Sequence, residues 1–123
     1  PGLRGRPEAE LFALGRKLRA HPAFPKGANV NFFDVEGPGR IWERTFERGV
    51  EGFTYACGTG TGSVAAVLTL QGAVSGRAVA VQMTGGELVV DVERCGSTVE
   101  HLFLTGPTNL VAKGELTDEE LPL

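Results

Sequence analysis

The spacing of hydrophobic residues predicts two helices of different character. In residues 7–22 the leucines Leu11, Leu14 and Leu18 recur at helical spacing, which gives one apolar stripe. Acidic side chains lie near the start of this helix and basic side chains near its end, as the helix dipole favours. Residues 61–72, TGSVAAVLTLQG, carry small and aliphatic side chains with little polar face. This second helix is therefore expected to be buried on most sides.

Alternating polar and apolar positions predict strands in the rest of the chain, with short turns between them. The first two, separated by GPG, are typical of a hairpin, and the last four are typical of an antiparallel meander. In the second strand, alternation places Ile41, Glu43 and Thr45 on one face of the sheet and the residues between them on the other. A polar tail, 117–123, follows the last strand. The predicted strands are 29–36, 40–47, 77–83, 88–93, 98–104 and 110–116.

Strands around one apolar helix, with one amphipathic helix besides, indicate a single α+β domain over residues 1–123. A hydrophobic content of 41% and a charged content of 22% are ordinary for a globular protein. The net charge of −3, with scattered basic residues, argues against nucleic-acid binding. No apolar run approaches the ~20 residues of a membrane span. Without a visible secretory leader or a disulfide framework, a cytoplasmic location is expected.

The strongest chemical signal is the segment ACGTGTG, where Cys57 directly precedes a run with three glycines in five residues. A helix N-terminus offers free N–H groups and the positive end of the helix dipole, so it favours anions. Glycine lets a ligand approach those N–H groups closely, and Thr59 can add a hydroxyl. The same field favours the thiolate form of a cysteine placed there. Cys57 is therefore predicted to be a base or nucleophile beside a carboxylate or phosphate.

Other interpretations of this segment stay open at this point. Its glycine spacing and its lack of lysine fit neither a dinucleotide fingerprint nor a P-loop. A glycine-rich turn with Cys57 as a small core residue is the structural alternative, because free cysteines are often buried. A cysteine hydrolase would need an adjacent histidine as its base. The histidines of the chain are His21, at a predicted helix end, and His101, in a predicted strand.

Four motifs resemble the diaminopimelate epimerase family in their order and spacing, over most of the chain from about Glu8 to about Gly114. They read HPAFPKGANVNFFDV, ERGVEGFTYACGTGTGSVAAV, MTGGELVVDV and LTGP. The resemblance implies a barrel-like antiparallel sheet around a central helix. It also implies a cofactor-free amino-acid epimerase that interconverts LL- and meso-diaminopimelate in lysine and peptidoglycan precursor biosynthesis. The chain would correspond to the C-terminal one of two domains, with the N-terminal domain absent.

The resemblance also implies a mechanism with two cysteines. In that family a thiolate removes the α-proton on one face of the substrate, and a second cysteine delivers a proton to the other face. Cys57 resembles the cysteine of the C-terminal domain, and Gly58 and Thr59 match positions whose backbone N–H groups hold the substrate α-carboxylate. Cys95 is interpreted as incidental, because RCGS is typical of a polar hairpin turn away from the glycine-rich segment.

Three further residues resemble substrate contacts. Glu47 matches a contact near the α-ammonium, and Arg48 matches a contact to the distal carboxylate, which a guanidinium can bind through two hydrogen bonds. Asn29, the first residue of NVNF, resembles another contact to the far end of the substrate. The alternatives are solvated strand-end charges for the first two and a turn residue for the third. Phe53 departs from the family, which usually has a glutamate there, and this puts the substrate preference in question.

The sequence therefore predicts an isomerase without cofactor or metal, which acts on a small amino acid and binds neither nucleic acid nor membrane. The chain alone is expected to be inactive, because it supplies one of two bases and half of the pocket. Its expected partner is the absent N-terminal domain with the second cysteine, and a homodimer is left open. Two alternatives remain: a same-fold isomerase of the proline racemase or phenazine-biosynthesis type, and a non-catalytic carboxylate-binding module.

Overall fold

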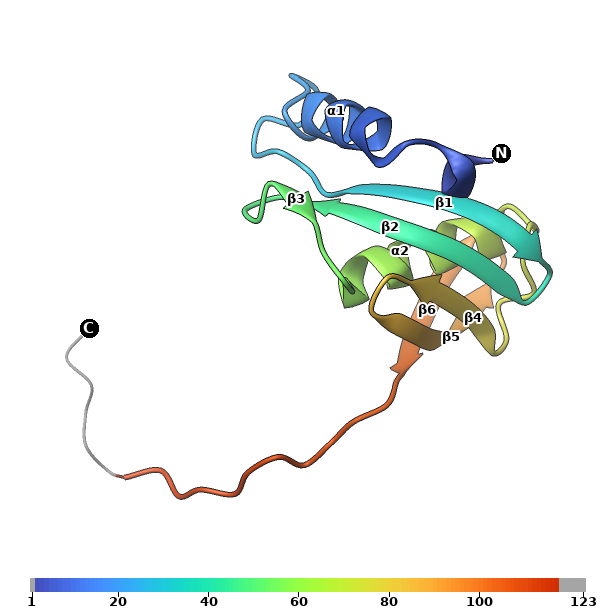
Figure 1. Cartoon of the computed structure of the whole chain (residues 1–123). Helices are drawn as coiled ribbons and strands as arrows, with labels where there is room; N and C mark the ends of the chain where they lie inside the picture. The colour runs from blue at the N-terminus through green and yellow to red at the C-terminus, as the bar shows by residue number, and fades with distance from the viewer. Residues whose placement is uncertain (1, 118–123) are drawn as a thin grey trace.

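The computed structural model describes residues 2–117, which form one sheet with a helix on each face (Figure 1). A short 3-10 helix, Leu3–Gly5, precedes helix α1, Glu8–Arg19, and the second helix is α2, Gly58–Leu70. The α+β class is confirmed. The strands are β1 (Val30–Gly37), β2 (Arg40–Glu47), β3 (Gly52–Phe53), β4 (Val79–Met83), β5 (Gly86–Cys95) and β6 (Thr98–Thr105).

The sheet is mixed and open rather than wholly antiparallel and barrel-like. Its strand order is β1-β2-β4-β5-β6, and β3 pairs with β2. The predicted hairpin β1–β2 and the antiparallel pairs β4–β5 and β5–β6 are confirmed, whereas β2 and β4 run parallel. The reason is the connection between β2 and β4, which passes through α2, because a strand–helix–strand crossover returns the chain in its first direction. Helix α2 contacts all five strands of this path, so it is the central helix that was expected.

The prediction of a last strand at 110–116 is wrong. Residues 106–117 form no strand and extend away from the domain (Figure 1). Leu110 and Val111 are 79% and 92% exposed. An alternating pattern alone cannot make a strand, since its backbone groups need a partner strand, and this segment has none within residues 2–117. The predicted polar tail lies outside the described residues from position 118 on.

Strand β2 is buried on both faces because each face meets a helix. On the α2 side, Ile41, Glu43 and Thr45 are at most 4% exposed, which confirms the face predicted from alternation. On the α1 side, Trp42 and Phe46 form a cluster with Leu11 and Phe32. The larger core lies between α2 and the sheet, and its members are Ile41, Val64, Ala65, Leu68, Val74, Val79, Val81, Val90 and Val92.

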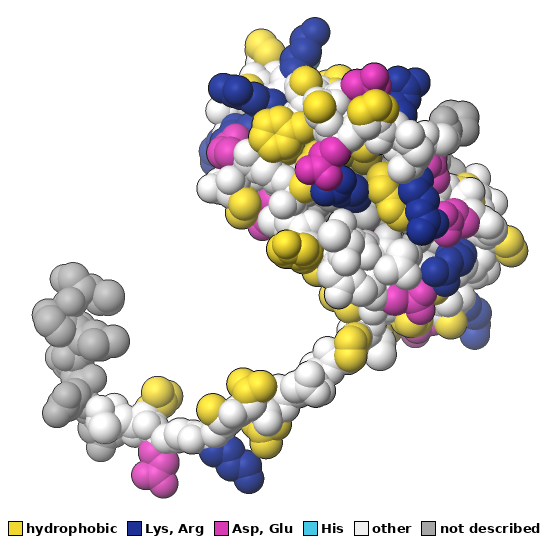
Figure 2. All heavy atoms as spheres, in the orientation of Figure 1, with side chains coloured by type: hydrophobic (Ala, Val, Ile, Leu, Met, Phe, Trp, Pro, Cys, Tyr) yellow, Lys and Arg dark blue, Asp and Glu magenta, His cyan; other side chains and the backbone are white. Residues whose placement is uncertain are grey.

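Helix α1 buries less of its predicted stripe than the sequence indicates. Leu11 is 3% exposed, but Leu14 and Leu18 are 44% and 38% exposed. The other buried residue of α1 is Gly15, one turn after Leu11. A Cβ at position 15 would lie 2.8 Å from Phe46 Cγ. Hydrophobic side chains consequently remain on the surface over α1, among basic and acidic ones (Figure 2). Within residues 2–117 no helix is long and apolar enough to cross a membrane.

This difference between two leucines of one helix is testable. We expect Leu11→Ala to lower the free energy of unfolding by about 2–5 kcal/mol, because it leaves a cavity against the sheet. Leu14→Ala, with the same change in helix propensity, should cost about 0.5 kcal/mol or less, since that side chain is 44% exposed and its loss leaves no closed cavity. Urea denaturation of both variants measures the two values. Equal losses of unfolding free energy in the two variants would contradict the described packing of α1 on the sheet.

Candidate active site at the start of helix α2

Helix α2 begins three residues earlier than predicted, because Cys57 caps it. Cys57 has an extended backbone, with φ −142° and ψ 101°, and its Sγ accepts a hydrogen bond from the Gly60 N–H at 3.4 Å. Its carbonyl accepts the first intrahelical bond from the Thr61 N–H at 2.9 Å. The glycines therefore lie inside the first turn of the helix and not in a loop before it. The N–H groups of Gly58 and Thr59 have no acceptor within residues 2–117.

The glycines of this turn let the helix pack closely on the sheet, a role that the sequence analysis missed. A Cβ on Gly60 would lie 2.6 Å from Asn31 Oδ1 and 2.7 Å from Thr45 Oγ1. On the opposite side of the helix, Gly58 and Gly62 face the leucines of β6. Only a residue without a side chain fits position 60 in this arrangement, because real Cβ atoms do not approach other atoms so closely. The glycines thus serve packing as well as access to the helix N–H groups.

Cys57 is surrounded by hydrogen-bond donors. Its side chain is 8% exposed, and its Sγ lies 3.4 Å from Thr59 Oγ1, 3.4 Å from the Gly60 nitrogen and 4.0 Å from Asn29 Nδ2. The other end of the Asn29 amide is fixed, because its Oδ1 accepts from the backbone N–H of Arg48 at 2.9 Å. The positive end of the α2 dipole lies beside the same sulfur. The burial of Cys57 agrees with the core alternative as well, but core packing alone does not require these polar neighbours.

A polar pocket of about 400 Å³ opens beside this cysteine. It contains three of the predicted residues, Asn29, Arg48 and Thr59. The guanidinium of Arg48 is held there by a hydrogen bond from Nη1 to the Lys26 carbonyl at 2.9 Å, and it keeps further N–H groups for a ligand. The other lining residues are Gly27, Ala28, Asn31, Gly60 and Ser63.

The remaining predicted residues lie at the margin of this pocket. Gly58 is the first residue of α2 and is exposed, so it contributes its backbone N–H rather than a wall. Glu47 ends β2 opposite Gly52 of β3, is half-buried, and forms no side-chain hydrogen bond within residues 2–117. The structure therefore brings Asn29, Arg48, Cys57 and Thr59 together, and it leaves Glu47 outside the pocket lining.

Two polar groups next to the pocket were missed by sequence reasoning. Asn31 lines the pocket, and its Oδ1 accepts from Thr45 Oγ1 at 2.8 Å. Glu43 is fully buried behind it and accepts from Thr61 Oγ1 at 2.8 Å. Burial raises the pKa of Glu43, and the hydroxyls of Thr61 and Thr45 oppose this increase. Period-two spacing was the available signal, since it places Asn31 beside Asn29, and Glu43 beside Thr45, on one face of the sheet.

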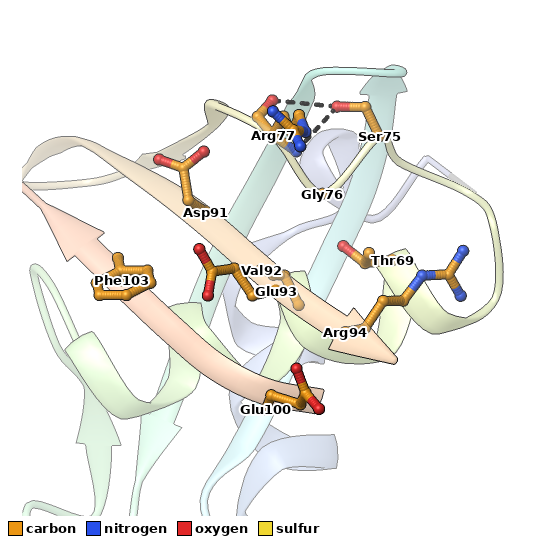
Figure 3. Close-up of a pocket in the computed structure, with 10 residues that line it drawn as sticks. All are labelled: Thr69, Ser75, Gly76, Arg77, Asp91, Val92, Glu93, Arg94, Glu100 and Phe103. Atoms are coloured by element: carbon orange, nitrogen blue, oxygen red, sulfur yellow. Dashed lines mark hydrogen bonds between the residues drawn. The ribbon is translucent and has the colours of Figure 1, made fainter. Parts of the chain in front are cut away.

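A larger pocket of about 660 Å³ lies at the other end of α2 and does not include the cysteine (Figure 3). Its walls mix acidic and basic side chains from β5, β6 and the turn after α2. One of them, Asp91, is already bound through Oδ1 to the Ala78 N–H at 2.8 Å. Thr69 near the end of α2 and Arg94 next to Cys95 both line this pocket. Because α2 has 13 residues, about 20 Å of helix separates this end from the end that Cys57 caps.

Phe53, the position that departs from the resembled pattern, lies on the α1 side of the sheet. Its ring is 6.1 Å from that of Phe12 and 5.9 Å from that of Phe46, in edge-to-face arrangements. The guanidinium carbon of Arg44 lies 4.2 Å above the same ring. Such contacts stabilise a core by about 0.5–1.5 kcal/mol each. Phe53 is thus a packing residue for α1, and it does not line the pocket beside Cys57.

The arrangement at the start of α2 can bind a carboxylate and exchange a proton beside it. Two free N–H groups at a helix N-terminus suit the two oxygens of a carboxylate. A carbon attached to that carboxylate would then lie near Cys57 Sγ, which can remove a proton from it as a thiolate or return one as a thiol. Within residues 2–117 the other cysteine, Cys95, is exposed and lies toward the far end of α2, so it cannot act on the same carbon.

Comparison with known proteins relates the chain to one family. The sequence model of the family described as "Diaminopimelate epimerase" matches residues 5–111. The diaminopimelate epimerase of Aquifex aeolicus is 40% identical to this chain over 116 residues, which is 93% of the chain and 40% of the relative. That of Archaeoglobus fulgidus is 40% identical over 112 residues, 91% of the chain and 38% of the relative. The chain thus spans about 40% of the length of these relatives.

The close contact at Gly60 gives a matched pair of variants. We expect Gly60→Ala to lower the free energy of unfolding by about 1–3 kcal/mol, because its methyl group would collide with Asn31 and Thr45. Gly58→Ala, in the same helical turn, should be near neutral, since its methyl group meets only the mobile end of Leu104 at 3.2 Å. Urea denaturation compares the two. A Gly60→Ala variant as stable as Gly58→Ala would contradict the described packing.

Proposed function

This chain belongs to the diaminopimelate epimerase family, and on that premise we propose that it supplies half of the active site of a cofactor-independent epimerase. The substrate would be LL-diaminopimelate, converted to the meso form for lysine and peptidoglycan precursor biosynthesis. The observation that carries the proposal is the position of Cys57, whose thiol caps α2 beside two helix N–H groups that have no acceptor in the described part of the chain. That position unites a proton-transfer group with a carboxylate site.

In the proposed reaction the α-carboxylate binds to the N–H groups of Gly58 and Thr59. The bound carboxylate lies at the positive end of the α2 dipole, where the negative charge that develops when the α-proton leaves is also stabilised. Cys57 Sγ exchanges the α-proton on one face of the carbon. Asn29 holds its amide toward this sulfur and is itself fixed by the Arg48 backbone, so the thiol is oriented before substrate arrives.

The far end of the substrate would lie toward Arg48. Its guanidinium lines the pocket and is anchored by the Lys26 carbonyl, which leaves donors for a distal carboxylate. Glu47, which ends β2 next to Arg48, is the candidate for the α-ammonium contact. A substrate with two carboxylates thus meets two separate donor groups, the helix N-terminus and the arginine.

Inversion at the α-carbon needs a second group on the opposite face of the substrate, because one base tends to return the proton where it was. Cys95 lies toward the far end of α2 from Cys57. We therefore propose that the second thiol comes from protein outside these 123 residues, as part of a domain that closes over the pocket. The relatives are long enough for such a domain, since the chain spans about 40% of them.

A small alkylating agent can test the carboxylate site without the second half. Iodoacetate carries its reactive carbon next to a carboxylate, as the substrate does, whereas iodoacetamide is its neutral analogue. We expect the ratio of the two alkylation rates at Cys57 to exceed the ratio at Cys95 by about tenfold, the factor given by 1.4 kcal/mol of extra binding. Mass spectrometry of the two cysteine peptides follows both sites in one sample, so Cys95 is the internal control.

A matched pair of variants isolates the backbone donor in that experiment. Gly58→Pro removes the N–H at the first helical position, where proline is tolerated and the extended backbone of Cys57 suits it. Gly58→Ala adds a Cβ but keeps the N–H. The iodoacetate preference at Cys57 should fall only in Gly58→Pro. Equal rate ratios at Cys57 and Cys95 in the unaltered chain would remove the support for a carboxylate site.

The chain by itself should not turn over. We expect LL-diaminopimelate incubated with the purified chain in deuterated water to yield no meso isomer beyond the level of a Cys57→Ala variant, because one face of the α-carbon lacks a proton donor. Proton NMR of the α position and chiral chromatography measure exchange and product. Turnover at rates typical of complete enzymes, about 1–10³ per second, would show that this chain contains both bases.

A further inference from the structure

A buried carboxyl group lies directly behind the pocket. Glu43 of β2 is fully buried under the first turn of α2. Its Oε2 accepts from Thr61 Oγ1 at 2.8 Å, and its Oε1 lies 3.2 Å from Thr45 Oγ1. Within residues 2–117 neither a basic side chain nor a backbone N–H hydrogen-bonds to it. An ionised carboxylate in such a place would be costly to bury.

The protons available to these groups show which form the carboxyl takes. The hydroxyl of Thr45 has one proton and lies within reach of two oxygens, Asn31 Oδ1 at 2.8 Å and Glu43 Oε1 at 3.2 Å. An amide oxygen can only accept, so Thr45 must donate to Asn31. The remaining contact is a hydrogen bond only when Glu43 carries a proton and donates it to Thr45 Oγ1. The hydrogen bonds then run in one direction, because Glu43 donates to Thr45 and Thr45 donates to Asn31.

We propose that Glu43 is a protonated positioning residue that fixes, through Thr45, the amide of Asn31 with its Nδ2 donor toward the pocket. Because Oδ1 is held by Thr45, the N–H groups of Asn31 are directed to the other side, and Asn31 lines the pocket beside Thr59 and Gly60. Asn31 is thereby an additional donor for a bound carboxylate. The proposal deepens the function proposed above and rests on it only in naming that ligand.

The surroundings of Glu43 favour its neutral form. Burial raises its pKa, and the hydrogen bonds that Thr61 and Thr45 could donate to an ionised carboxylate oppose that increase without cancelling it. The facing groups are Thr61 from α2, Asn31 from β1, Thr45 from β2 itself and the thioether of Met83 from β4, whose sulfur lies 3.2 Å from Thr61 Oγ1. None of them is charged. The positive end of α2 would favour an anion, but the Gly60 N–H that could bind one donates to Cys57 Sγ instead.

Gly60 makes possible the relay of hydrogen bonds that runs from Glu43 through Thr45 to Asn31. A Cβ at that position would lie within 3.1 Å of Glu43 Oε1 as well as against Asn31 and Thr45. The backbone of α2 thus covers the relay and keeps water from it. When pH rises far enough to ionise Glu43, the Thr45 hydroxyl has a stronger acceptor in the carboxylate, and Asn31 loses the bond that orients it.

The first experiment compares the unaltered chain with Glu43→Gln across pH. A raised pKa in the folded state means that folding binds the proton more tightly, so this contribution to stability is complete below the unfolded-state pKa and is lost as pH rises through the folded-state pKa. The side-chain amide of glutamine donates to Thr45 and accepts from Thr61 at every pH, so Glu43→Gln does not lose this stability as pH rises. Groups elsewhere titrate equally in both proteins and cancel.

We expect the unfolding equilibrium constant of the unaltered chain, divided by that of Glu43→Gln, to rise up to tenfold per pH unit above the ordinary range of glutamate, measured by urea denaturation from pH 4 to 8. A ratio that is flat with pH, or that falls, would overturn the proposal, because it would mean that Glu43 is ionised in the folded protein at no cost.

The second experiment tests the connection to the pocket. The iodoacetate-to-iodoacetamide rate ratio at Cys57 should fall about threefold or more in Glu43→Leu, which cannot donate to Thr45, and should be restored in Glu43→Gln. A purely structural role would not distinguish the two reagents, and equal ratios in all three proteins would overturn the relay. If the unaltered chain shows no iodoacetate preference, the proposed function fails, whereas the unfolding measurements still decide the protonation of Glu43.

Discussion

The close approach of the first turn of α2 to strands β1 and β2 is the constraint on which the candidate site depends. It is possible because position 60 has no side chain, and a Cβ there would lie 2.6 Å from Asn31 Oδ1. The approach brings the Cys57 cap beside the Asn29 amide and covers the buried carboxyl of Glu43. It also fixes the helix N-terminus against a rigid sheet, so the free N–H groups of the helix keep their direction. Packing and chemistry therefore share one set of contacts.

The hydrogen-bond donors of the site come from neighbouring parts of one domain. The helix N-terminus, the asparagines of β1 and its preceding loop, and Arg48 all come from this domain. We propose that this polar pocket binds the substrate but does not complete the reaction alone, because a proton delivered from one face cannot invert a carbon centre. The relatives in the diaminopimelate epimerase family are longer than this chain, which spans about 40% of their length. We propose that the opposite face is contributed from outside it.

The departure at Phe53 concerns stability rather than recognition. Phe53 lies four residues before Cys57 in the sequence, and its departure from the family pattern put the substrate preference in question. In space, its ring packs with Phe12 and Phe46 on the α1 face, under Arg44. An aromatic residue there adds to the cluster that seats α1, whereas the pocket lies on the other face of the sheet. Phe53 is close to Cys57 in sequence but not in function, because the chain crosses from one face of the sheet to the other between β3 and the cap of α2.

Local sequence patterns determined the elements and much of the chemistry. Alternation gave both faces of β2, the hairpins followed from turn residues, and the glycine-rich segment after a cysteine predicted an anion site at a helix start. Tertiary structure decided what those patterns cannot contain. Strand direction across β2 and β4 depends on the path of the crossover through α2. Whether residues 110–116 form a strand depends on the presence of a partner strand. The exposure of Leu14 depends on which turn of α1 contacts the sheet. The protonation of Glu43 follows from burial and from neighbours far away in sequence, such as Thr61, because desolvation and hydrogen bonding act through space and not along the chain.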